Sequence, residues 1–223
     1  DIARHNGLIA SPNCSTIQLL VALAPLYRES RITRIIASTY QAVSGTGRGA
    51  ITELADQTPI ALSGDGEIEC REYPYQIAFN VLPQIGSFKE FEFTSEEWKM
   101  DRESKKMLHD DDIEIACTAV RVPVFNGHAE SVYIETEEPI GVERAREILA
   151  AAPGVILMDD PDNAVYPLPI EASGKDPVFV GRIRRDPYRE NGLHLWIVAD
   201  NIRKGAALNV IQIAEKMIED GII

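Results

Sequence analysis

The chain has 223 residues, 35 of them acidic and 22 basic, which gives a formal net charge of −13. The hydrophobic share of 45% is too high for a disordered chain, and three cysteines are too few for a disulfide scaffold. The negative charge opposes nucleic-acid binding, so an anionic ligand must be captured by a few local lysines or arginines. No apolar run is long enough to cross a membrane and no secretion signal opens the sequence, so we expect a cytoplasmic protein.

The first half of the sequence predicts a short strand and a helix, then a long strand and a glycine-rich turn. The first residue is Asp1 and not an initiator methionine, which suggests a trimmed or excised chain. In chain order we predict a strand at 7–10, a helix capped by Ser15 or Thr16, a strand at 32–43, a glycine turn at 44–49, a helix at 50–56, a loop at 59–67 and a helix at 95–108 capped by Thr94 or Ser95.

The second half is richer in strands. They are predicted at 113–124, 131–136, 155–158, 178–184 and 193–199, with helices at 141–152 and 204–220. The last helix carries an apolar stripe at helical spacing, made of Ala207, Val210, Ile211, Ala214, Met217 and Ile218. Helices and strands alternate irregularly, without a repeated βαβ unit. The sequence therefore predicts one α/β (α+β) domain with a mixed, largely antiparallel sheet and flanking helices.

Cys14 lies in the stretch SPNCST (11–16), where the first helix is predicted to begin. Free backbone N–H groups and the helix dipole lower the pKa of a thiol at such a position and can stabilise an oxyanion. The position is typical of a nucleophile, and the alternative is a buried, small apolar side chain. Cys70 and Cys117 lie in strand-like segments and are weaker candidates. No two cysteines or histidines have metal-ligand spacing, so no metal site is predicted.

Two further pairs could carry chemistry. Arg121 and His128 flank a strand end and a turn, where the arginine could bind a carboxylate through two hydrogen bonds and the histidine could transfer its proton. The alternative is an exposed ion-pairing arginine and an ordinary loop histidine. Glu96 and Lys99 share one face of a predicted helix, which is also typical of a solvated ion pair.

The segment GTGRGA (45–50) fits the GxGxxA pattern of dinucleotide-binding turns. The strand before it ends in polar residues, and no second strand ending in an acid follows about 20 residues later. The pattern therefore favours a glycine loop beside a cofactor over a complete nucleotide-binding unit.

Seven stretches, spread in order over most of the chain, together resemble aspartate-semialdehyde dehydrogenase. Each is modest alone, but their common order makes the resemblance specific. They are SPNCSTIQ (11–18), STYQAVSGTGRGA (38–50), YQIAFNVLPQIG (75–86), EEWK (96–99), RVPVFNGHAES (121–131), VGRIR (180–184) and LWIVADNIRKGAALNVIQIAE (195–215). The resemblance implies a sheet of the type found in the C-terminal domain of glyceraldehyde-3-phosphate dehydrogenase.

The resemblance also implies roles for the residues of these motifs. Cys14 matches the nucleophile, Gln41 the residue that orients the intermediate, and His128 the general acid/base. The substrate-binding positions are Arg121 for the α-carboxylate, Glu96 for the amine, and Lys99 and Asn13 for the phosphate. Ser44 and Gly45 match the loop that approaches NADP, and Asn201 matches a position near the nicotinamide.

The family's activity is NADP-dependent reduction of L-aspartyl 4-phosphate to L-aspartate 4-semialdehyde, in the biosynthesis of lysine, methionine, threonine and isoleucine. The family begins with a dinucleotide-binding domain that has no counterpart here, so residues 1–223 resemble its catalytic and dimerisation domain. We therefore expect a homodimer that is inactive by itself and binds NADP weakly, with helix 204–220 packing on the absent domain in the complete enzyme. The alternatives are an N-acetylglutamyl-phosphate reductase-like enzyme and a non-catalytic dimerisation module.

Overall fold

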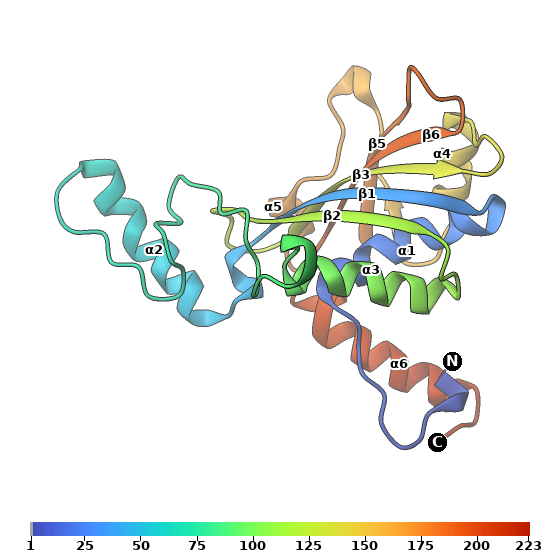
Figure 1. Ribbon diagram of the computed structural model, residues 1–223, viewed down its shortest axis with the longest axis horizontal. Helices are drawn as coiled ribbons and strands as arrows, with labels where there is room; N and C mark the ends of the chain where they lie inside the picture. The colour runs from blue at the N-terminus through green and yellow to red at the C-terminus, as the bar shows by residue number, and fades with distance from the viewer. Residues whose placement is uncertain (1) are drawn as a thin grey trace.

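A six-stranded mixed sheet organises the computed structural model, which describes residues 2–223 (Figure 1). The strands lie in the order β2-β1-β3-β6-β5-β4. Their bounds are β1 Ile32–Gln41, β2 Glu114–Arg121, β3 His128–Thr136, β4 Val155–Leu157, β5 Val178–Arg185 and β6 Gly192–Ala199. The central pairings β1·β3, β3·β6 and β6·β5 are antiparallel, and the edge strands β2 and β4 run parallel to their neighbours. The predicted mixed, largely antiparallel sheet is confirmed.

Three helices cover one face of this sheet. They are α1 Cys14–Glu29, α3 Ser95–Leu108 and α4 Val142–Ala151. Leu19, Leu23 and Leu26 of α1 are fully buried in the main core between helices and sheet. Their spacing of three and four residues places them on one helix face. Because α1 packs so deeply, its first residues are held firmly against the strand ends.

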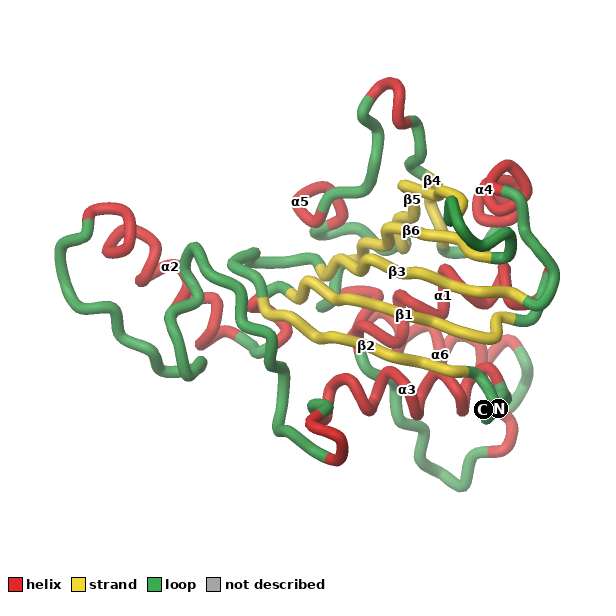
Figure 2. The backbone as a smooth tube through the Cα atoms, turned by 45° about the horizontal axis from the view of Figure 1, so that its top comes forward, coloured by secondary structure: helices red, strands yellow, loops and turns green. Residues whose placement is uncertain are grey.

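The other face of the sheet has no helix over its central strands (Figure 2). It presents Ile36 and Tyr40 of β1, both 39% exposed, and Trp196 of β6, whose ring lies 5.6 Å from that of Tyr40. The helix α2 Arg48–Ser63 and the segment that follows it form an arm beyond the end of the sheet (Figure 1). The short helix α5 Pro169–Ala172 lies near the same end.

The last helix projects away from the sheet alongside the N-terminal segment (Figure 1). A π-helical turn, η5 Arg203–Ala207, leads into α6 Leu208–Glu219. Of its predicted apolar stripe, Val210, Ile211 and Ile218 are 53%, 54% and 64% exposed, whereas Met217 is buried. In the part of the chain from residue 2 onward, no helix is both long and apolar enough to cross a membrane.

Several predicted boundaries are wrong. Residues 7–10 form no strand, because Gly7 has a left-handed φ of +89° and Leu8 is 85% exposed with no strand beside it. The helix predicted at 50–56 continues through Pro59 and ends only at Gly64, whose left-handed φ of +72° suits a helix C-terminus. The predicted loop at 59–67 is therefore helical in its first half. The capping prediction for α3 is confirmed at Thr94, which forms a capping box with Glu97.

Candidate active site

The first turn of α1 presents Cys14 to the end of the sheet. Its cap is Asn13 rather than the predicted Ser15 or Thr16, since the Asn13 side-chain oxygen accepts hydrogen bonds from the backbone N–H groups of Ser15 (2.9 Å) and Thr16 (3.3 Å). The backbone N–H of Asn13 in turn donates to Glu103 of α3, at 2.8 Å. Glu103 was not predicted from the sequence, because the contact joins residues 90 positions apart.

Glu96 of α3 links three of the predicted site residues. One carboxylate oxygen accepts from the Asn13 amide at 2.8 Å and from the Gln41 amide at 3.3 Å. The other lies 3.6 Å from the Lys99 ammonium. Glu96 is 8% exposed, so its carboxylate is largely desolvated. It is bonded to Asn13, the residue directly before the nucleophile candidate Cys14. The alternative of a solvated surface pair is thereby excluded for Glu96, whereas Lys99 is exposed.

Arg121 and His128 meet at the backbone of one residue, Ala42. The Arg121 Nη1 donates to the Ala42 carbonyl at 2.7 Å, and the Ala42 N–H donates to His128 Nδ1 at 3.0 Å. Because Nδ1 accepts this bond, a neutral His128 carries its proton on Nε2. Within residues 2–223, neither His128 Nε2 nor Arg121 Nε has a hydrogen-bond partner. Both side chains thus keep an unused donor, and the alternative of a surface arginine and a loop histidine is excluded.

The loop after β1 approaches this pair closely. A Cβ at Gly45 would lie 2.9 Å from Arg121 Nη1 and 3.1 Å from His128 Nε2. Any larger residue at Gly45 would therefore crowd Arg121 Nη1 and cover the unused Nε2–H of His128. Ser44 precedes it and exchanges hydrogen bonds with the Asn201 side chain at 3.0 and 3.2 Å, while Asn201 also accepts from the Gly127 N–H at 3.0 Å. Asn201 thus holds two loops together at the end of the sheet.

The π-helical turn closes the other side of Cys14. A Cβ at Gly205 would lie 3.0 Å from the Cys14 Cβ, which is tighter than side chains ordinarily pack, so a larger residue would push the two segments apart. Asp200 just before the turn accepts from the backbone N–H groups of Ile202 and Arg203 and so fixes its start. Gly205 was not predicted from the sequence, although π-helical turns are often found at functional sites.

Burial dominates the electrostatics of Cys14. Burial raises the pKa of the thiol most, the charge of Glu96 also raises it, and the Ser15 N–H and Arg121 lower it; the net result is a pKa of about 11. The prediction that the helix start depresses this pKa is therefore wrong for the protein without a ligand, because desolvation of the thiolate outweighs the N–H groups. Burial also lowers the pKa of His128 well below its usual value, and Arg121 lowers it further, so His128 is neutral at pH 7.

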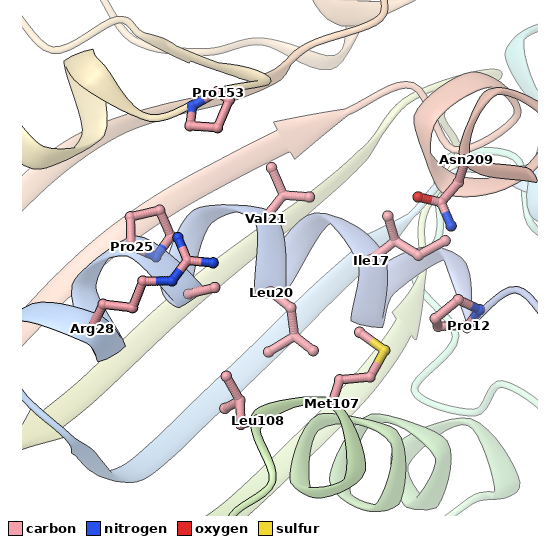
Figure 3. Close-up of a pocket in the computed structure, with 11 residues that line it drawn as sticks. Pro12, Ile17, Leu20, Val21, Pro25, Arg28, Met107, Leu108, Pro153 and Asn209 are labelled. Atoms are coloured by element: carbon pink, nitrogen blue, oxygen red, sulfur yellow. The ribbon is translucent and has the colours of Figure 1, made fainter. Parts of the chain in front are cut away.

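One cavity lies apart from these residues, and another borders Arg121. An apolar groove of about 320 Å³ on the outer side of α1 is lined by Ile17 and Leu20 of α1 and Met107 of α3 (Figure 3). A cavity of about 390 Å³ lies between Arg121 and the arm, with Tyr73 and Leu82 in its wall. Over residues 2–223, no group of three or more His, Cys, Asp or Glu side chains is placed to hold a metal ion.

Residues 23–204 match the family described as semialdehyde dehydrogenase, dimerisation domain. The chain belongs to this family. It is 53% identical to an aspartate-semialdehyde dehydrogenase of Aquifex aeolicus over 99% of this chain and 65% of the relative. It is 50% identical to the enzyme of that name from Bacillus subtilis, over 97% of this chain and 65% of the relative.

Solved structures agree with the sequence relatives. Aspartate semialdehyde dehydrogenase II of Vibrio cholerae, in a crystal structure described as complexed with ASA, superposes with a TM-score of 0.92 at 47% identity, covering 95% of this chain and 62% of that one. A structure of the enzyme from Candida albicans described as containing NADP has a TM-score of 0.70 at 24% identity, which shows a shared fold. The chain thus spans about two thirds of the length of the relatives that it matches.

Proposed function

We propose that this chain is the catalytic and dimerisation part of an NADP-dependent aspartate-semialdehyde dehydrogenase. The reaction is the reductive dephosphorylation of L-aspartyl 4-phosphate to L-aspartate 4-semialdehyde and phosphate. The observation that carries the proposal is the meeting of Cys14, Gln41, Glu96, Arg121 and His128 at one end of the sheet, from elements far apart in the sequence. The family and its relatives support the same substrate class.

The thiolate of Cys14 would attack the acyl carbon of the substrate and displace phosphate, leaving a thioester. NADPH, when bound, supplies the hydride that reduces this thioester. Expulsion of the aldehyde then regenerates the thiolate. Negative charge develops on the acyl oxygen in both stages, so the chain must supply hydrogen-bond donors to that oxygen.

His128 is suited to donate to that oxygen. Its Nδ1 accepts from Ala42, so the Nε2–H is the group left to face a ligand. This proposed role differs from the general acid/base role implied by the resemblance: a neutral His128 donates the Nε2–H hydrogen bond to the developing oxyanion. Gln41, which is anchored to Thr39 and Glu96 at 3.2 and 3.3 Å, would orient the intermediate from the other side.

The substrate's charges match the charges of the site. Arg121 binds Ala42 through Nη1, which leaves the Nε edge of its guanidinium for the α-carboxylate. The desolvated carboxylate of Glu96 would bind the α-ammonium group, and Lys99, which is exposed beside it, would bind the phosphate. Asn13 holds Glu96 through its amide, so its part in phosphate binding would use the remaining N–H of that amide.

Two alternatives are less well supported. An N-acetylglutamyl-phosphate reductase-like substrate has an acetylated amine, which needs no buried carboxylate such as Glu96. A non-catalytic dimerisation module would have no use for unpaired donors on Arg121 and His128, whose burial costs stability.

The residues around Gly45 fit one end of NADP. Gly45 leaves a space that a Cβ would fill, next to His128, and Ser44 and Asn201 line the same loops. The adenine end of NADP would need further residues, and this chain covers 65% of the length of each of the two aspartate-semialdehyde dehydrogenases. We therefore propose that the complete enzyme uses a further dinucleotide-binding domain, that α6 packs on it through its exposed apolar stripe, and that this chain alone binds NADP weakly.

The uncovered face of the sheet is the proposed dimer interface. Ile36, Tyr40 and Trp196 give it an apolar centre, and partner copies would bury it by packing sheet on sheet. A homodimer in the cytoplasm, without nucleic acid or membrane, completes the proposal.

Turnover tests the proposal directly. Phosphate-dependent reduction of NADP by aspartate semialdehyde would be measured for this chain and for a version that adds the family's N-terminal dinucleotide-binding domain. We expect no turnover by the first and clear turnover by the second. N-acetylglutamate semialdehyde as the preferred substrate would show the reductase alternative, and inactivity of both versions would support the non-catalytic module.

A further inference from the structure

A second polar pair lies directly behind Cys14 and His128. Gln18 follows Cys14 by four residues on α1, so the two share one helix face. Glu130 follows His128 by two residues on β3, so both side chains lie on the same side of the sheet. Gln18 and Glu130 therefore lie behind Cys14 and His128, one helical turn further along α1 and two residues further along β3.

Both deeper side chains are completely buried. Gln18 and Glu130 are each 0% exposed, and within residues 2–223 neither their amide atoms nor their carboxyl oxygens form a hydrogen bond of ordinary geometry. Gln18 nevertheless lies close enough to Glu130 to lower the pKa of its carboxyl, against the larger raising effect of burial. Gln18 thus lies within interaction range of Glu130, and the polar atoms of both side chains are otherwise unpaired.

Among residues 2–223, no cation lies close enough to Glu130 to shift the pKa of its carboxyl. The titratable groups coupled to it among the described residues are the thiols of Cys14 on α1 and Cys117 on β2. Its register partners are Thr39 on β1 and Ile197 on β6, which carry no charge. A carboxylate buried without a cation is strongly disfavoured, whereas a protonated carboxyl can both donate to an amide and accept from it.

We propose that Glu130 keeps its proton and pairs with Gln18 as a neutral acid–amide pair, which holds the start of α1 against β3 and so aligns Cys14 with His128. The carboxyl O–H donates to the Gln18 carbonyl, and the Gln18 N–H donates back to the carboxyl C=O. Glu130 is a positioning residue, since it acts through the elements that carry Cys14 and His128. Its catalytic consequence rests on the proposed function, but its charge state does not.

The charge state is tested without turnover. The pH dependence of Cys14 reaction with a small disulfide reagent would be measured in a Cys70→Ser background, because Cys70 is exposed and would also react. Glu130→Gln exchanges a neutral acid for a neutral amide, so the apparent pKa of Cys14 should move by less than about 0.3 pH unit. A fall of about one pH unit would mean that a negative charge was removed, and would overturn the proposal. Glu135→Gln, on the same strand, is the matched control.

The pairing and its effect are tested separately. In thermal unfolding, Gln18→Met and Glu130→Met should each lower Tm, and the double variant should lower it by less than the sum, because both partners are removed together. Additive decreases would refute the pair. In the complete enzyme, Glu130→Met should lower kcat by about tenfold with KM within about twofold, while Glu130→Gln keeps kcat within about threefold. Wild-type kcat in Glu130→Met would refute the positioning role, whereas an inactive wild type would refute only the proposed function.

Discussion

Replacing Glu96 by glutamine should make Cys14 more acidic. Glu96 is 8% exposed, binds the residue next to Cys14 at 2.8 Å, and is the strongest charge that raises the thiol pKa. Two unit charges roughly 7 Å apart interact by about 2.4 kcal/mol at an effective dielectric constant of about 20, and by about 0.6 kcal/mol in water. The variant should therefore lower the thiol pKa by about 0.4 to about 1.7 pH units, and we expect about one because Lys99 partly screens Glu96.

The expected change in reactivity follows from that shift. A pKa that falls from about 11 to about 10 raises the thiolate fraction at pH 8 about tenfold. The less basic thiolate is about threefold less nucleophilic, so the rate with a disulfide reagent should rise about threefold. A substrate ammonium group bound to Glu96 would also lower the pKa of the Cys14 thiol, because it neutralises the negative charge of Glu96. Binding of the proposed substrate would thus itself activate the thiol.

The assay is the pH profile of the disulfide-exchange rate in a Cys70→Ser background. Glu143→Gln, an exposed change on α4, is the matched control and should leave the profile unchanged. Lys99→Gln removes the cation beside Glu96 and should shift the profile in the opposite direction. An unchanged or raised pKa in Glu96→Gln would refute the electrostatic account of this site.

Four other outcomes are expected. Cys14→Ser should abolish turnover of the complete enzyme while keeping the fold, and more than a tenth of wild-type activity, as a rough threshold, would refute the nucleophile. Arg121→Lys should strongly lower kcat/KM, because lysine cannot bind a carboxylate through two parallel bonds; an unchanged value would make Arg121 structural. Arg31, bonded to Asp110 at 2.7 and 2.8 Å, holds the pKa of that carboxyl at about 2 instead of 3.8. The ionised Asp110 therefore stabilises the fold fully above pH 3.8, and this stabilisation is lost as the pH falls through about 2. Asp110→Asn should thus cost about 1 kcal/mol at pH 7 and little near pH 2 in chemical unfolding. This chain should sediment as a dimer at micromolar concentration, and sedimentation as a monomer would refute the proposed homodimer. Calorimetry should show no low-micromolar NADP affinity, and tight binding would refute the proposal that this chain alone binds NADP weakly.

The sequence alone determined the features that depend on local pattern. The apolar spacing of α1, the capping box at Thr94 and the β-branched runs of the sheet follow from side chains a few residues apart. The motifs around Cys14 and His128 likewise pointed to the candidate chemistry before their distances were known. Predicted helix boundaries were wrong where the structure differs from the local sequence preference. Pro59 was predicted to lie in a loop, but it lies inside the helix α2.

Only the tertiary structure decided how the site residues act on one another. Ala42 fixes the proton of His128 on Nε2, and Glu96 joins Asn13 to Gln41, through contacts that span 55 to 86 residues. The raised pKa of Cys14 has the same origin, because the helix start is visible in the sequence but the desolvation around it is not. Burial is a property of all the elements packed around a group, so it is set when the chain folds and cannot be inferred from the neighbours of Cys14 in sequence.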